Sequence, residues 1–170
     1  MRKKRHSQAS FLMASALALA LVISGACAAQ QPLQKTQIGA EMPDFTLKDV
    51  NGNDHTLSKH RGKIVVLDFC SQECPWSLGA DKTLPDLAKK YSEQGVVFLG
   101  IDSHRETTPD QIKRYAEETK IPYPILKDVN NEYADKVGAT HTPELYVVDK
   151  EGKLAYRGAY DNREEAEEAG

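Results

Sequence analysis

The sequence has no excess of positive charge. Its 22 lysines and arginines are outnumbered by 25 aspartates and glutamates, so the net charge is −3. The basic side chains are scattered through predicted helices, whereas binding to nucleic-acid phosphates needs a basic stripe or patch. The composition therefore excludes nucleic acid as a partner.

The sequence also lacks an apolar run long enough for a comfortable membrane span, which takes about 20 residues. The longest uncharged run is FLMASALALALVISGA at residues 11–26, and basic residues precede it at positions 2–5. A basic start followed by a short apolar segment is typical of a signal peptide. We expect residues 1–28 to be this signal and the protein to be exported, to the periplasm or the outer side of a membrane.

Cysteine is scarce, since the chain has only three. Cys27 ends the stretch ISGAC, which resembles a bacterial lipoprotein signal, but the ACA around it also fits an ordinary small-x-small cleavage site. In an exported protein, pairing of Cys70 with Cys74 would leave one thiol over, and lipidation of Cys27 would account for it. A polar linker at residues 29–37 would then tether the domain to the membrane.

From about Ile38, predicted strands alternate with predicted helices. The patterns predict, in chain order, a hairpin at Asn51-Gly52, a buried strand over 63–69, a helix that includes Leu78 to Tyr91 with a kink at Pro85, a buried strand over 95–102, a helix capped by Thr108 and Gln111, and a hairpin across 150–152. This order predicts an α/β domain over residues 38–161, with a mixed central β-sheet flanked by helices on both faces. Residues 162–170 form an acidic C-terminal tail outside it.

Three segments are distinctive together: VVLDF with a Cys-Pro after it at the strand-to-helix junction, GVVFLGID, and HTPELYVVDKEGKLAYRG. In this order they resemble thioredoxin-fold proteins of the redoxin group, which includes AhpC/TSA and peroxiredoxin-like proteins and exported thiol-disulfide oxidoreductases. The resemblance covers about Ile38 to Asp161. It implies a thioredoxin-like fold and a redox-active thiol, without a bound cofactor.

By this resemblance Cys74 is the reactive cysteine, at the start of a helix. Backbone N–H groups and the helix dipole at such a position stabilise the thiolate, which attacks disulfides and peroxides. The resemblance also implies that Asp68 is a proton-relay carboxylate, whose pKa burial would raise, and that Thr142-Pro143 is a cis-proline loop that binds substrate backbone. Trp76, beside the reactive cysteine, would form an apolar lip for a substrate protein.

The sequence departs from the thioredoxin pattern at the second thiol. Ser77 occupies the position three residues after Cys74 where thioredoxins have another cysteine. Cys70, four residues upstream, would replace it as the resolving thiol if the turn brings the two Cα atoms within about 7 Å. The alternative is that Cys70 is a packing residue, because free cysteine is among the most buried residue types.

Peroxide reduction is the second hypothesis for the same residues. Peroxiredoxins resemble one another in a proline and a hydroxyl at fixed spacing before the peroxidatic cysteine, and a distant arginine helps to orient the peroxide. Ser71 keeps the hydroxyl three residues before Cys74, but Leu67 replaces the proline and Glu73 adds a negative charge. Arg157 is the best candidate for the arginine, although a solvated strand residue is its simpler interpretation.

Binding without turnover is the third hypothesis. Cys70, Cys74 and His141 are a ligand set that could hold a soft ion such as Cu(I) or Zn(II), and a non-catalytic scaffold would need only one exposed thiol. We favour thiol-disulfide exchange, with protein thiols and disulfides as partners, over peroxide reduction and over both binding alternatives.

Overall fold

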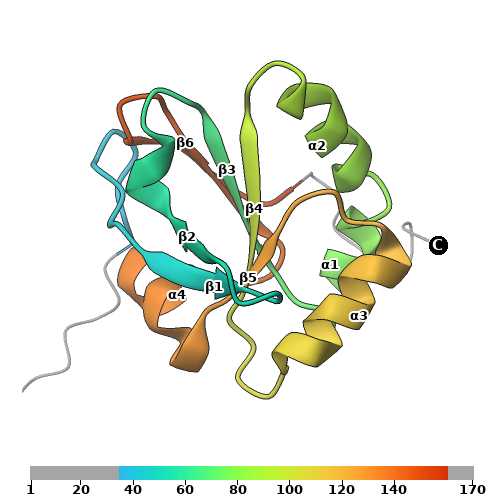
Figure 1. Ribbon diagram of the computed structural model, residues 1–170. Helices are drawn as coiled ribbons and strands as arrows, with labels where there is room; N and C mark the ends of the chain where they lie inside the picture. The colour runs from blue at the N-terminus through green and yellow to red at the C-terminus, as the bar shows by residue number, and fades with distance from the viewer. Residues whose placement is uncertain (1–34, 161–170) are drawn as a thin grey trace, which may run out of the picture. The chain divides into compact units, whose positions relative to one another are not determined.

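Figure 1 shows the computed structural model, which describes residues 35–160. The predicted signal peptide, Cys27, most of the predicted linker and the acidic tail lie outside the described residues. Within residues 35–160, no helix is both long and apolar enough to cross a membrane.

Seven strands form one mixed sheet. The strands are β1 (Thr46–Asp49), β2 (Asp54–Thr56), β3 (Val65–Cys70), β4 (Val97–Asp102), β5 (Ile125–Lys127), β6 (Glu144–Val148) and β7 (Leu154–Gly158), and the helices are η1 (Leu57–His60), α1 (Pro75–Ala80), α2 (Leu84–Ser92), α3 (Pro109–Thr119), η2 (Val129–Asn131) and α4 (Glu132–Val137). The strand order is β2-β1-β5-β4-β3-β6-β7. β4 is parallel to β3 and β5, and the other neighbouring pairs are antiparallel. The predicted mixed α/β sheet is confirmed.

β3 lies inside the sheet and is buried along its whole length. Val65, Leu67 and Phe69 belong to the core cluster that α4 covers. Val66 packs with residues of α2, and Cys70 packs with a residue of α3. In Figure 1, α1, α2 and α3 accordingly lie on one side of the sheet and α4 on the other. A strand buried on both faces reads as a continuous apolar run, which is why the sequence predicted it.

The predicted kinked helix is instead two helices. α1 ends at Ala80, α2 begins at Leu84, and Pro85 lies in the first turn of α2. A proline there needs no N–H partner, so it starts a new helix and does not bend an existing one. Leu84 and Ala88 are buried, but three residues that continued the apolar pattern, Leu78, Leu87 and Tyr91, are exposed.

Local turn and cap signals were read correctly, and short elements were missed. Gly52 has the left-handed conformation of a hairpin turn, and Thr108 forms the full capping box with Gln111 at the start of α3. The sequence did not predict β5, which follows Pro124, or α4. β5 has three residues and α4 six, which is too short for a periodic pattern to stand out.

Candidate functional site

Cys74 lies where the turn after β3 meets the cis-proline loop. It is the N-cap residue of α1, which begins at Pro75. The Thr142–Pro143 peptide bond is cis, as the resemblance implied. The thiol of Cys74 donates to the Thr142 carbonyl, with 3.0 Å between Sγ and the oxygen. Two segments 68 residues apart in the sequence therefore meet at this sulfur.

The surroundings of Cys74 favour its thiolate. Partial burial raises the pKa of the thiol, but hydrogen bonds from the Thr142 side chain, from the Trp76 and Ser77 amides and from the Ser77 hydroxyl outweigh this effect, so the pKa is lowered. Hydrogen bonds to the charged form have this effect because they stabilise the thiolate and not the neutral thiol. A half-buried cysteine of lowered pKa is a competent nucleophile.

Ser77 has a defined hydrogen-bonding role that the sequence did not reveal. Its side chain is only 1% exposed. The Ser71 amide donates to Ser77 Oγ at 3.2 Å, so the oxygen is occupied as an acceptor and the hydroxyl proton is free to point at the Cys74 sulfur. Ser77, which occupies the position of the second thioredoxin cysteine, thus stabilises the thiolate of Cys74.

Cys70 has a different environment. The thiol is free, 7% exposed, and packs with Ile112 and Ile125. A methyl group added to Gly100 of β4 would lie 3.4 Å from its sulfur, so the sulfur is packed against the neighbouring strand. Burial, with nearby carboxylates including Asp68, raises the pKa of Cys70 well above its usual value. The predicted role of Cys70 as a resolving thiol stays a prediction.

Asp68 is buried, as the resemblance implied. Its side chain is 1% exposed, and Oδ2 accepts a hydrogen bond from Tyr123 Oη at 3.1 Å. Oδ1 has no hydrogen-bond partner in the described part of the chain. Burial, and secondarily the charge of Asp81, raise the pKa of Asp68 to about 7. Such a carboxyl group can hold and release a proton near neutral pH.

A pocket of 620 Å³ opens beside Cys74. Cys74 and Ser71 line it together with His141 of the cis-proline loop, and the β4–α3 loop, residues 103–106, forms another wall. The Ser71 oxygen accepts a hydrogen bond from the Glu73 amide at 3.2 Å. Trp76 is 43% exposed and is not among the residues that line this pocket. Its predicted contact with a substrate protein stays a prediction.

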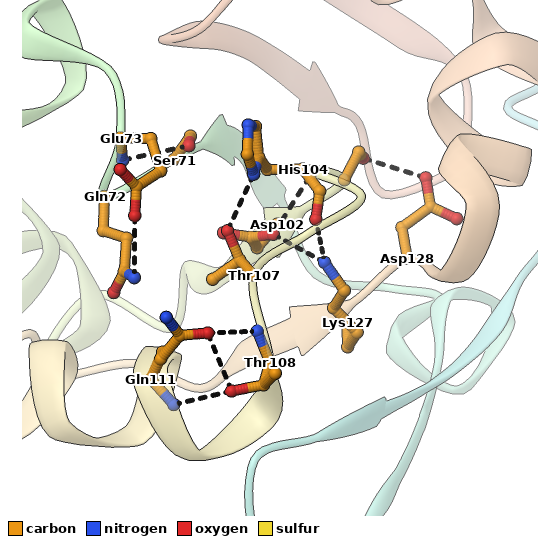
Figure 2. Close-up of polar contacts among 11 residues, drawn as sticks. Ser71, Gln72, Glu73, Asp102, His104, Thr107, Thr108, Gln111, Lys127 and Asp128 are labelled. Atoms are coloured by element: carbon orange, nitrogen blue, oxygen red, sulfur yellow. Dashed lines mark hydrogen bonds and ion pairs between the residues drawn. The ribbon is translucent and has the colours of Figure 1, made fainter.

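The pocket wall at residues 103–106 is held by two buried carboxylates (Figure 2). Asp102 accepts hydrogen bonds from the His104 amide at 3.0 Å and from Lys127 Nζ at 2.9 Å. Asp128 accepts from Ser103 Oγ at 2.9 Å and from two amides at the start of α4, also at 2.9 Å. Because Ala134 of α4 also lines the pocket, Asp128 links two of the segments that line it. Nothing in the local sequence pattern signalled these long-range contacts.

The arginine in the pocket is not the one that the sequence suggested. Arg157 donates to the Thr36 carbonyl at 3.4 Å and does not line the pocket. Arg105, from the β4–α3 loop, lines it instead. The position of this loop next to the turn that carries Cys74 follows from the parallel pairing of β3 and β4, which puts their carboxyl ends at one edge.

The structure does not assemble the proposed metal ligands. Among residues 35–160, no three His, Cys, Asp or Glu side chains are placed to hold a metal ion, so Cys70, Cys74 and His141 do not form a ligand set. His141 Nδ1 instead lies 3.6 Å from the buried carboxylate of Glu144.

Comparison with known proteins places the chain in a family. Over 124 residues it is 28% identical to the thiol-disulfide oxidoreductase ResA of Bacillus thuringiensis subsp. konkukian, covering 71% of this chain and 69% of that protein. It is 31% identical to a chloroplastic peroxiredoxin Q of Triticum aestivum, covering 76% of this chain and 61% of that protein. A crystal structure of an uncharacterized conserved protein from Geobacillus kaustophilus has a TM-score of 0.72 and 32% identity, covering 75% of this chain and 71% of that one. Residues 38–157 match the sequence profile of the AhpC/TSA family, and the chain belongs to that family.

Proposed function

We propose that the protein is an exported thiol-disulfide oxidoreductase in which Cys74 is the nucleophile. The observation that carries this proposal is the half-buried Cys74 sulfur, whose pKa is lowered and which contacts the cis-proline loop. The relative named as a thiol-disulfide oxidoreductase supports the choice of reaction. Protein disulfides and thiols are the proposed substrates, and no bound cofactor takes part.

The proposed reaction begins when the Cys74 thiolate attacks one sulfur of a substrate disulfide. A mixed disulfide forms with Cys74, the substrate S–S bond breaks, and the other substrate sulfur leaves as a thiolate and takes up a proton. Asp68 is the proposed proton relay, since a carboxyl group with a pKa of about 7 is half protonated near neutral pH. Thr142 and Pro143 would bind the substrate backbone, and Trp76 would contact its apolar side chains.

Cys70 remains a predicted resolving thiol, and that role has a structural requirement. Its sulfur would have to leave the cluster with Ile112 and Ile125 and lose its raised pKa before it could attack Cys74. A buried thiol reacts slowly because little of it is thiolate.

The test of the proposed function is reduction of a model protein disulfide with dithiothreitol as the reductant. Cys74→Ser should lower the rate to the level without protein, because the nucleophile is gone. Cys70→Ala is the matched control, and under the proposed chemistry it should keep most of the activity, because dithiothreitol itself can resolve the mixed disulfide. Full activity in Cys74→Ser would contradict the proposal.

Peroxide reduction is the second candidate, because Ser71 and Arg105 line the pocket with Cys74. A hydroxyl and an arginine beside a thiolate are the groups that would orient a peroxide, and one relative is named as a peroxiredoxin. Peroxide consumption that depends on Cys74 and falls in Arg105→Ala would support this reaction. Thiol-disulfide exchange without peroxide consumption would leave thiol-disulfide exchange as the only supported reaction.

Export and the membrane tether are proposals that rest on the sequence of residues 1–28. Mass spectrometry of the mature N-terminus distinguishes the two alternatives. A terminus at Cys27 carrying lipid mass would support the lipoprotein, cleavage after Ala28 would support a soluble exported protein, and an uncleaved chain would contradict export by this signal.

A further inference from the structure

The proposed exchange leaves a mixed disulfide on Cys74 that a second thiol must resolve. Ser77, at the position of the second thioredoxin cysteine, has no sulfur. Cys70 is packed between Ile112, Ile125 and the backbone of β4, and it does not line the Cys74 pocket. The described part of the chain therefore presents one thiol to this pocket, which favours a resolving thiol from another molecule.

The pocket beside Cys74 has the size of a small-molecule site. Its volume of 620 Å³ lies within the range of about 300–1,000 Å³ that is usual for ligand pockets. The hydrogen bonds of Asp102 and Asp128 hold the β4–α3 loop and the start of α4, so two of its walls are fixed in place before a ligand binds. A wall that is already ordered lowers the entropy cost of binding.

The charged residues that line the pocket indicate which chemical groups a ligand would need. Arg105 lines it, and within residues 35–160 its guanidinium makes no hydrogen bond or ion pair. An unpaired guanidinium is a ready partner for a carboxylate, which it binds with two parallel hydrogen bonds. Glu73 and Glu106 line the same pocket and would favour an ammonium group. His104 and His141 complete its titratable lining.

We propose that this pocket binds a low-molecular-weight thiol of the amino-acid type, such as cysteine or glutathione, and that Arg105 holds its carboxylate while its sulfur resolves the mixed disulfide on Cys74. The proposal rests on the proposed function, because it needs the mixed disulfide. It makes Arg105 a binding residue for the second substrate, and it gives Ser77 the role of stabilising the only sulfur that cycles in the pocket.

The chemistry uses two small thiols per turn. The first, as its thiolate, attacks Cys74 Sγ; the bond to the substrate sulfur breaks, and the substrate leaves as a thiolate that takes up a proton. The second small thiolate attacks the sulfur of the first, and Cys74 leaves as a thiolate. The two small thiols are oxidised to their disulfide, and the substrate disulfide is reduced to two thiols.

The experiment follows this resolving step directly. A Cys27→Ser variant of the chain is treated with Ellman's reagent, so that Cys74 forms a mixed disulfide with one thionitrobenzoate group while the other group leaves, and the excess reagent is removed. Release of the bound group as the yellow free thiolate is then measured against increasing concentrations of glutathione or of cysteamine, which has no carboxylate. We expect the rate with glutathione to reach a plateau. Arg105→Ala should lower the glutathione rate at low concentration about tenfold, the usual effect of losing one charge-assisted contact, and should change the cysteamine rate less than about twofold.

Arg114→Ala is the matched control, because Arg114 is exposed on α3 and does not line the pocket. It should leave both rates unchanged. A rate that rises linearly with glutathione, or equal losses with both thiols in Arg105→Ala, would overturn the proposal while leaving the proposed function intact. Release of the colour without any added thiol would show that Cys70 resolves the mixed disulfide on Cys74, if it occurs in the protein that keeps Cys70 and not in the Cys70→Ala variant. Failure of Cys74 to take up the label at all would overturn the proposed function as well.

Discussion

Cys70 and Cys74 are four residues apart in the sequence and have opposite chemical environments. Cys70 ends a strand, and its sulfur is packed among Ile112, Ile125 and the backbone of β4, where its pKa is raised. Cys74 follows the turn, contacts Thr142, and has a lowered pKa. Two cysteines that are close in sequence can therefore have different burial and different pKa shifts, because the direction of a strand side chain is set by the sheet.

A parallel contrast separates two buried carboxylates near Cys70. Asp102 forms an ion pair with Lys127 and accepts a hydrogen bond from the His104 amide. Asp68 has only the Tyr123 hydroxyl, and its second oxygen is without a partner in the described part of the chain. The first carboxylate anchors a loop, while the second has a raised pKa, which favours its protonated form.

The largest expected effect is a difference in alkylation between the two thiols. We expect iodoacetamide to modify Cys74 in the native protein about a thousandfold faster than Cys70, because Cys70 is both buried and mostly un-ionised. Peptide mass spectrometry at timed intervals measures both rates. In guanidinium chloride the two rates should become equal. Equal rates in the native protein would contradict the claim that Cys70 is less accessible and less ionised than Cys74.

Removing the cation from the buried ion pair should destabilise the protein. Lys127→Met leaves Asp102 buried without its partner, so the free energy of unfolding should fall by about 3 kcal/mol. Urea denaturation measures this loss. Lys113→Met, an exposed lysine on α3, is the control and should have little effect. An unchanged stability in Lys127→Met would show that the pair does not hold the loop.

Replacing Asp68, the buried carboxylate that has no ion-pair partner among the described residues, should stabilise the protein near neutral pH. The pKa of Asp68 is raised from 3.8 to about 7 in the folded protein, so the folded state keeps a proton that the unfolded chain has already released. Stability from this group is present below pH 3.8 and is lost as the pH rises to about 7. Asp68→Asn should therefore raise the free energy of unfolding at pH 8 by about 2 kcal/mol, after allowance for the imperfect hydrogen bonds of a buried amide.

The measurement for Asp68→Asn is urea denaturation across this pH range. The variant should be somewhat less stable than the wild type at acid pH, because the imperfect hydrogen bonds of the amide act at every pH, and it should become the more stable of the two as the pH rises to about 7. A gap that is constant with pH would mean that Asp68 does not titrate in this range. A lower stability of the variant at pH 8 would contradict the assigned sign.

The smallest expected effect is at Ser77. Ser77→Ala removes a hydrogen bond to the Cys74 thiolate, so the pKa of Cys74 should rise and alkylation at neutral pH should slow about tenfold. The pH dependence of the alkylation rate measures it. Ser92→Ala, an exposed serine at the end of α2, serves as the control. An unmoved midpoint in Ser77→Ala would mean that its hydroxyl does not contact the sulfur.

Much of the fold could be predicted because its signals are local. The buried run that became β3, the turn at Gly52 and the capping box of Thr108 each depend on neighbouring residues. The break before Pro85 was misread, because proline fits both a kink and a first turn. β5 and α4 are too short for their period to be recognised.

The site was predictable where a motif marks it and hidden where long-range packing builds it. Cys74, Asp68 and the cis-proline at Pro143 were identified by resemblance. Arg105 was not, because only the pairing of β3 with β4 brings its loop beside Cys74. A search for charged residues directly after each predicted parallel strand could have found it, since such loops gather at one edge of the sheet.

The most direct test of the account is to identify the product formed when the reduced protein reacts with excess glutathione disulfide. Digestion and mass spectrometry then show which sulfur atoms are joined. We predict a mixed disulfide between glutathione and Cys74, with Cys70 still a free thiol. An intramolecular Cys70–Cys74 disulfide as the main product would contradict the account, because Cys70 would then be the resolving thiol and its burial no barrier to reaction.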